Sequence, residues 1–179
     1  SAGEEVWDDM AGDGNEISAQ SGDNSFVYAG TFGGVDISAQ YTKNGSAASG
    51  GENQSDGSIG ASYTVGDTGL TIGYAAGEDG ATADEDVMYA TYVIGGATIG
   101  ASKFDREVGS STADRDTTWY GASFAVNENL SVSAGKAVTN FGNKDVDQES
   151  SGFAASYTMG SITVVTSMNK QDGVGGTSG

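Results

Sequence analysis

The stretch GASYTVGDTGLTIGYAAG, residues 60 to 77, decides the fold of this chain. On both sides of its short turn, apolar side chains alternate with Gly, Ser or Thr. The apolar residues are Ala61, Tyr63, Val65, Leu70, Ile72 and Tyr74. A period of two is typical of β-strands with two unlike faces, and a turn of two or three residues joins such strands into a hairpin. The stretch therefore predicts a β-hairpin with one apolar and one polar face.

Four further stretches repeat this pattern. They are YAGTFGGVDISAQYTK (28–43), YATYVIGGATIGASKFD (89–105), YGASFAVNENLSVSAGKAV (120–138) and AASYTMGSITVVTSMNK (154–170). Together the five hairpins give ten strands, the first over residues 25–32 and the tenth over residues 161–169. Because each strand is followed at once by its partner, the pattern predicts an all-β, antiparallel up-and-down array over residues 25–179.

Longer segments rich in Gly, Ser and acidic residues separate the hairpins. They cover residues 44–56, 77–85, 106–116 and 139–150. One end of the array therefore has only tight turns and the other only long loops, as in outer-membrane β-barrels with short periplasmic turns and long external loops. A soluble β-sandwich is the competing fold. It needs a second apolar sheet, whereas all ten strands here have the same half-polar face.

The two faces predict two surroundings. The polar face, mostly Gly, Ser and Thr, is a poor core and indicates a wall that faces water in a lumen. The apolar face has an aromatic residue near each turn, where a bilayer interface favours aromatic side chains. These predicted membrane-interface residues are Phe32, Tyr63, Tyr92, Phe124 and Tyr157. The candidates for an opposite girdle, near the loops, are Tyr41, Tyr74, Phe104, Trp119, Tyr120 and Phe153.

Composition excludes several classes of function. The 179 residues include 25 acidic and 7 basic side chains, a net charge of −18, so no nucleic-acid partner is expected. Cysteine, histidine and proline are absent, which excludes disulfides, zinc sites built on imidazole or thiolate, and histidine-dependent nucleophiles. No apolar run is long enough for a transmembrane helix, but the strands of a membrane barrel need only about 9 to 11 residues each. The start SAGEEVW does not resemble a signal peptide, so we expect that a leader was removed or that the chain begins inside a longer protein.

The arms GASYTVGDTGLTIGYAAG, YGASFAVNENLSVSAGK and GFAASYTMGSITVVTSM, with the acidic segment before the first strand, resemble the bacterial general porins of the alphaproteobacterial type. The resemblance implies a homotrimer in the outer membrane of Gram-negative bacteria, each barrel having about sixteen strands. It also implies an external loop that folds into the lumen, with acidic residues that face basic residues of the wall. On this basis residues 1–24 are the inward-folded constriction loop, residues 25–179 are ten strands of the wall, and the chain is part of a longer porin.

The acidic stretch EEVWDDMAGDGNEIS, residues 4–18, has three interpretations. As a pore constriction, Glu4, Glu5, Asp8, Asp9, Asp13 and Glu16 would set a negative potential in the lumen. As a calcium site, Asp8, Asp9, Asp13 and Asn15 would supply oxygen ligands, although their spacing does not fit an EF-hand. As a solvated tail, the stretch would have no fixed structure. A catalytic acid pair is disfavoured because no flanking residues indicate a sheltered pocket.

The sequence thus predicts a porin: a passive diffusion channel for small hydrophilic solutes and ions, with a mild cation preference and outer-membrane lipid around it. No enzymatic activity is expected, and no cofactor other than calcium. The alternative is a secreted or cell-surface all-β structural or adhesion protein with acidic, calcium-binding loops. Lys103 and Lys136 have the parity of the apolar face, whereas Arg106, Arg115, Lys144 and Lys170 are placed in or beside the loops.

Overall fold

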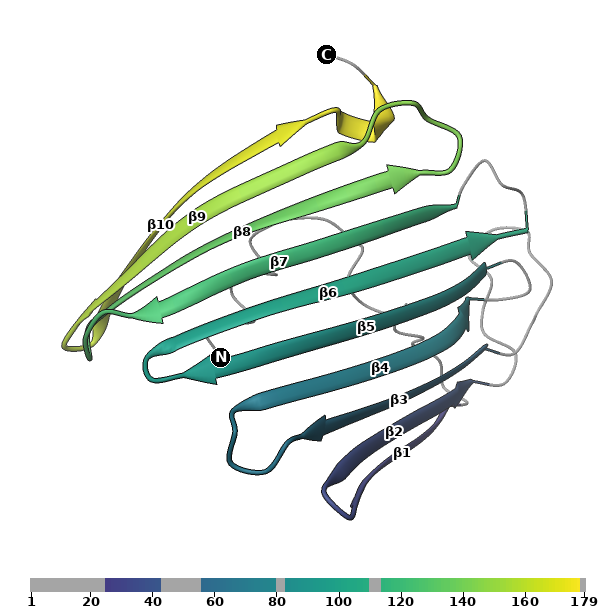
Figure 1. Ribbon diagram of the computed structural model, residues 1–179, viewed down its shortest axis with the longest axis horizontal. Coiled ribbons are helices and arrows are strands. Elements are labelled where there is room, and N and C mark those ends of the chain that lie inside the picture. The colour runs from purple at the N-terminus through teal and green to yellow at the C-terminus, as the bar shows by residue number, and fades with distance from the viewer. Residues whose placement is uncertain (1–24, 43–55, 80–82, 110–113, 178–179) are drawn as a thin grey trace.

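A computed structural model describes residues 25–42, 56–79, 83–109 and 114–177 (Figure 1). These residues form ten β-strands and one short 3-10 helix, labelled η1. The elements are β1 (Ser25–Phe32), β2 (Val35–Thr42), β3 (Asp56–Thr64), β4 (Leu70–Asp79), β5 (Ala83–Ile94), β6 (Ala97–Val108), β7 (Arg115–Ala125), β8 (Leu130–Phe141), β9 (Gln148–Met159), β10 (Ile162–Asp172) and η1 (Val174–Gly176). No helix in these ranges is long and apolar enough to cross a membrane.

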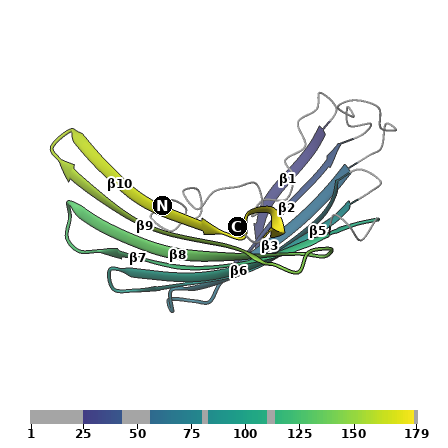
Figure 2. The same cartoon turned by 90° about the horizontal axis from the view of Figure 1, so that it is seen from above.

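All ten strands form one antiparallel sheet in the order of the chain, from β1 to β10. The sheet is curved along its whole width, like a trough (Figure 2). It is not closed, since β1 and β10 are its two edges. The predicted up-and-down array is confirmed. The soluble-sandwich alternative is wrong, because the described strands belong to one sheet and make no second layer.

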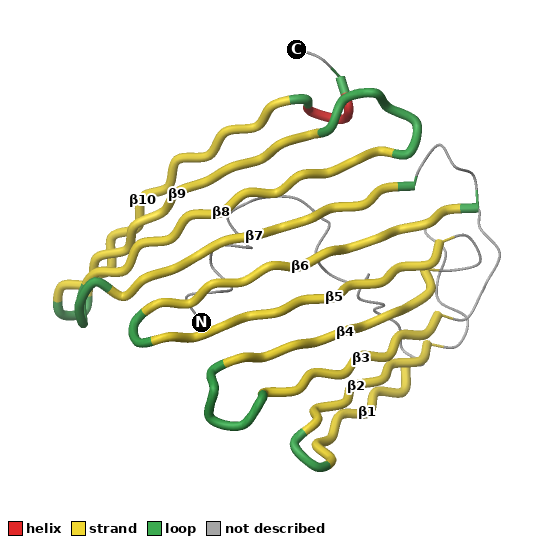
Figure 3. Tube along the Cα trace, viewed as in Figure 1, coloured by secondary structure: helices red, strands yellow, loops and turns green. Residues whose placement is uncertain are grey.

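Tight turns join the two strands of each hairpin at one end of the sheet (Figure 3). Gly33 and Gly34, between β1 and β2, have φ angles of 60° and 85°. Positive φ at both central residues defines the turn whose twist matches that of the flanking strands, and glycine adopts it at no steric cost. In the turn between β7 and β8, the side chain of Asn127 accepts hydrogen bonds from the backbone N–H groups of Asn129 and Leu130, at 2.9 and 3.0 Å.

The strands are longer at the other end than the sequence predicts. The segment 77–85 was expected to be a loop, but β4 continues to Asp79 and β5 begins at Ala83. Likewise β6 continues to Val108, β7 begins at Arg115, β8 continues to Phe141 and β9 begins at Gln148. Acidic and polar composition indicated loops here. However, backbone pairing between neighbouring strands continues beyond the apolar part of each strand and includes acidic and polar residues.

The two faces differ in burial. Of the strand residues whose burial the structure describes, eight are buried, and the register of the sheet puts all of them on one face. They are Ala83, Glu85, Phe104, Thr117, Trp119, Ser123, Ala137 and Ser150. Because side chains crowd together on the inside of a curved sheet, this is the concave face. The convex face exposes most of the large apolar residues, for example Ile59, Tyr63 and Met168.

Candidate pore wall

Small and hydroxyl-bearing residues dominate the concave face, as predicted for a lumen wall. Three pairs of threonines face each other across neighbouring strands, and their hydroxyl oxygens lie 2.9 to 3.0 Å apart. These pairs are Thr64 with Thr71, Thr117 with Thr139, and Thr158 with Thr163. Such cross-strand hydrogen bonds stabilise the sheet without an apolar core on this face.

One row of directly opposed residues crosses the concave face over all ten strands. It consists of Thr31, Asp36, Ser62, Gly73, Tyr89, Ser102, Trp119, Ala137, Ser150 and Gln171. Most of these side chains are small or polar. Because the register has no break from β1 to β10, this row is continuous, and it is called the wall row below.

Four of the concave side chains that the structure describes are charged. They are Asp36, Glu85, Arg106 and Arg115. Glu85 stands directly opposite Arg106, and Arg106 directly opposite Arg115. The Oε1 atom of the buried Glu85 carboxylate lies 3.3 Å from the Nε atom of Arg106. Two acids and two bases leave this part of the wall without net charge.

The sequence placed Arg106 and Arg115 in or beside a loop. Arg115 is indeed the first residue of β7, directly beside the loop, whereas Arg106 lies inside β6. Both belong to strands and point to the concave face. Parity along the strands was the available signal: Arg106 has the parity of Ser102, whereas Lys103 has the parity of the outward-facing Ile99. Lys103 and Lys136 do lie on the convex face, as the sequence predicted.

A small apolar cluster interrupts the polar wall. Phe104 is 1% exposed and Trp119 is 5% exposed, and together with Ala137 and the partly buried Val87 they form the Phe104 cluster. The Phe104 and Trp119 rings meet edge to face at 6.4 Å, and the guanidinium of Arg115 lies 5.8 Å from the Phe104 ring centre. The assignment of Phe104 and Trp119 to the outer girdle was therefore wrong. It used their position near the strand ends and neglected parity, and of the neighbours Trp119 and Tyr120 only one can face outward.

The five predicted membrane-interface aromatics, Phe32, Tyr63, Tyr92, Phe124 and Tyr157, all lie exposed on the convex face. So do Tyr41, Tyr74, Tyr120 and Phe153 of the opposite set. Their role at a membrane interface stays a prediction.

Four of these aromatics follow a regular stagger. The four residues are Tyr63 in β3, Tyr92 in β5, Phe124 in β7 and Tyr157 in β9. Each lies two strands after the one before it. Each also lies two residues closer to the turn than the residue that direct cross-strand pairing would place in the same row. Two residues along a strand are about 6.8 Å and two strands across are about 9.6 Å. If the four rings lie at one height, the strands are tilted by about 35°, within the range of membrane barrels. Phe32 departs from the stagger, since it shares the row of Tyr63.

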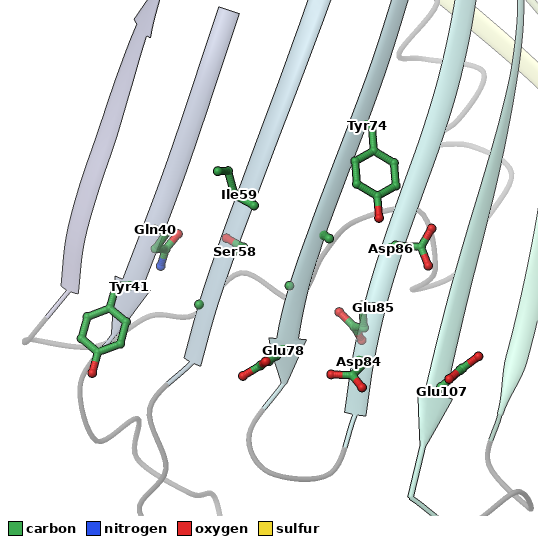
Figure 4. A pocket seen from close by; sticks show the side chains of 13 residues that line it. Gln40, Tyr41, Ser58, Ile59, Tyr74, Glu78, Asp84, Glu85, Asp86 and Glu107 are labelled. Atoms are coloured by element: carbon green, nitrogen blue, oxygen red, sulfur yellow. The ribbon is translucent and has the colours of Figure 1, made fainter.

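Charged residues collect on the convex face toward the loop ends of the strands. Lys103 pairs with Asp105, Lys136 with Glu149 and Lys170 with Asp172. Glu78, Asp84 and Glu107 stand directly opposite one another on β4, β5 and β6 (Figure 4). They border a hollow of about 780 Å³ whose other lining residues include Tyr41, Ile59 and Tyr74. Within the described ranges, no group of three or more acidic side chains could hold a metal ion.

The acidic stretch of residues 4–18 lies outside the described residues. The structure therefore does not test the constriction residues Glu4, Glu5, Asp8, Asp9, Asp13 and Glu16, nor the calcium ligands Asp8, Asp9, Asp13 and Asn15. Both assignments stay predictions.

A curved up-and-down sheet with an apolar, exposed convex face and a concave face of small polar residues is the wall of an outer-membrane β-barrel. Two solved structures share this fold. A porin refined at 1.8 Å resolution has a TM-score of 0.62 and 18% identity, over 82% of this chain and 55% of that chain. A loop L8 deletion mutant of OmpT, an outer membrane protein of Vibrio cholerae, has a TM-score of 0.63 and 16% identity, over 83% of this chain and 57% of that chain. The chain therefore spans little more than half the length of either protein.

The sequence matches the Gram-negative porin family over residues 2–173, and the chain belongs to this family. It is a protein of the bacterial outer membrane. No curated protein shows significant sequence similarity to it.

Proposed function

We propose that this chain builds the wall of a channel through which small hydrophilic solutes and ions diffuse passively across the outer membrane. The concave face carries this proposal. Its Gly, Ser and Thr residues offer hydrogen bonds to water and to solutes but no strong binding groups over most of the wall, which suits diffusion better than retention. The proposal involves no chemical reaction and no cofactor.

The alternative, a secreted or cell-surface adhesion protein, is less well supported because the chain belongs to a porin family. The two differ in their need for detergent. With its convex apolar residues exposed, the porin should stay folded and monodisperse in detergent micelles and should aggregate in plain buffer. Light scattering with far-UV circular dichroism measures both. A folded, monodisperse protein in buffer alone would contradict the channel.

A mild cation preference is the second part of the proposal. The four charged side chains described on the concave face sum to zero, so this part of the proposal rests on another segment of the chain. Residues 1–24 include seven acidic residues and no basic one. Carboxylates inside a water-filled lumen set a negative potential that favours cations. We propose that residues 1–24 fold into the lumen and form its constriction.

We propose that residues 1–24 contact the wall at the Phe104 cluster. A residue on a single-layer sheet has neighbours at its sides but none above it, yet Phe104 and Trp119 are almost fully buried. We propose that residues 1–24 cover these two side chains. Arg106 and Arg115 at the margin of the cluster complement the carboxylates of residues 1–24, and the same segment offers Trp7 and Met10 for apolar contact.

Reversal potentials across planar bilayers test the constriction. The test variant neutralises the six constriction residues, Glu4, Glu5, Asp8, Asp9, Asp13 and Glu16, to Gln or Asn in the complete protein. We expect its cation preference to fall. The matched control replaces Glu78, Asp84 and Glu107 on the convex face, and it should keep the preference of the parent. An unchanged reversal potential in the test variant would contradict the proposal that these residues form the constriction.

Two finer points stay predictions. The homotrimer that the resemblance implies can be tested by the mass of the protein in detergent. Calcium binding by Asp8, Asp9, Asp13 and Asn15 can be tested by thermal unfolding with added calcium, which raises the midpoint only if the folded state binds the ion.

A further inference from the structure

A second hollow, of about 500 Å³, lies against the concave side of β1 to β5. The concave residues that line it include Thr31, Asp36, Ser38, Gly60, Ser62 and Tyr89. It therefore combines one carboxylate, three hydroxyls and one aromatic ring on a floor of small residues.

Tyr89 forms one wall of this hollow because Gly73 has no side chain. The two residues are directly opposed on β5 and β4. A Cβ atom placed on Gly73 would lie 2.2 Å from Cε1 of Tyr89, so the ring lies across the glycine and leans over β4. The ring is still 37% exposed, which leaves part of it accessible from the concave side.

Asp36 stands on the opposite side. Its Oδ1 atom accepts a hydrogen bond of 2.5 Å from the hydroxyl of Thr31, and its side chain is exposed. Ser62 is its direct partner on β3. No Lys or Arg occurs in residues 25–42 or 56–79, which hold β1 to β4, so these strands supply no basic side chain to the hollow.

We propose that this hollow is a binding subsite for small organic ammonium ions. The ammonium group would take a charge-assisted hydrogen bond to the carboxylate of Asp36 and further bonds to the serine hydroxyls. Its carbon atoms would lie against the Tyr89 ring, whose face attracts cations. Anions would meet the carboxylate without a compensating base. A hard metal ion needs several oxygen ligands of its own, and no such acidic group exists in the described ranges.

The subsite rests on the proposed channel, because it needs the concave face to line a water-filled lumen. Asp36 and Tyr89 belong to the wall row and are three strands apart, about 14 Å between their backbones. The Tyr89 ring spans part of that distance. The remaining space suits a solute of a few heavy atoms.

Current recordings in planar bilayers with ethanolammonium as the probe test the subsite in the complete protein. For the parent we expect a saturable, concentration-dependent reduction of the current, which neutral glycerol does not produce. Asp36→Asn and Tyr89→Leu should each raise the half-blocking concentration at least about fivefold. Tyr89→Phe retains the ring over Gly73 and should change it less than twofold. Ser167→Ala on β10, a control on the same face, should leave it unchanged.

The outcomes separate the two proposals. A parent protein that gives no conductance overturns the channel itself. A parent that conducts normally but shows no saturable block overturns the subsite alone. So does a block that Asp36→Asn and Tyr89→Leu leave unchanged, since the probe would then bind elsewhere in the lumen.

Discussion

Arg106 and Glu85 face each other from neighbouring strands on the concave side of the sheet, with Arg106 Nε 3.3 Å from Glu85 Oε1. Arg115 stands on the far side of Arg106, directly opposite it. Among the described residues, Glu85 is the one buried carboxylate, and its partner Arg106 stands between it and Arg115. Its charge therefore offsets a repulsion between two like charges that the sheet register forces together.

Glu85→Gln should destabilise the folded protein by about 1 to 3 kcal/mol, because it removes the charge that compensates Arg106 while the arginine stays partly buried. Urea unfolding in detergent micelles measures the change. Asp105→Asn is the matched control. It breaks the more exposed pair with Lys103 on the convex face and should cost less than about 1 kcal/mol. Equal losses in the two variants would contradict the special role of Glu85.

Phe104→Ala should cost about 3 to 5 kcal/mol, since it removes the most buried ring of the Phe104 cluster and leaves a cavity beside Trp119. The same urea titration measures it. In a Trp7→Phe background, where Trp119 is the one tryptophan of this chain, fluorescence gives a second readout. Loss of the neighbouring ring should let water reach the Trp119 indole and shift its emission to longer wavelength. Phe153→Ala, an exposed residue of the convex face, is the control and should have the smaller effect. If the two substitutions cost the same, the cluster does not act as a core.

Gly73→Ala should destabilise the sheet by about 1 to 3 kcal/mol, because the new methyl group overlaps the Tyr89 ring. The cost should shrink when Tyr89 is also replaced by Ala, and a double-mutant cycle measures that coupling. Gly57→Ala is the control, since the nearest atom to its Cβ position is 3.8 Å away. A full cost for Gly73→Ala in the Tyr89→Ala background would show that Tyr89 is not the obstacle.

Tyr63→Cys and Ser62→Cys should report opposite surroundings when each carries a nitroxide spin label. The chain has no cysteine of its own, so the label attaches at one position only. In lipid vesicles the label at position 63 should be accessible to oxygen dissolved in the bilayer. The label at position 62, on the concave face, should instead be accessible to a water-soluble nickel complex. The reverse pattern would invert the assignment of the two faces.

The hairpins were predictable because both of their signals are local. Alternation defines the two faces within a strand, and glycine pairs such as Gly33–Gly34 define the turns, so the order of the strands follows from the chain itself. The exposed position of Tyr63 and its four counterparts was predictable for the same reason.

The outer parts of the strands were not predictable from composition. Residues such as Asp84 and Glu107 are typical of loops, and only their pairing across strands shows that the sheet continues. Parity, applied over the full length of β6 and β7, would have placed Arg106 and Phe104 on the concave face. The burial of Phe104 depends on contacts between side chains of different strands, and a local pattern holds no information about such contacts.

In the proposed channel, the stagger of the aromatic rings, about 35°, would also set the depth at which a solute meets each concave residue. If the rings lie at one height, a row of directly opposed residues cannot lie at one height too. Over the nine strand spacings from Thr31 to Gln171, the wall row would climb about 25 Å, close to the thickness of the hydrocarbon layer. The row is then a spiral path. A permeating ion would pass Asp36, Tyr89 and Gln171 at different depths, one after another. The order of residues along the wall row would therefore be the order in which the ion contacts them.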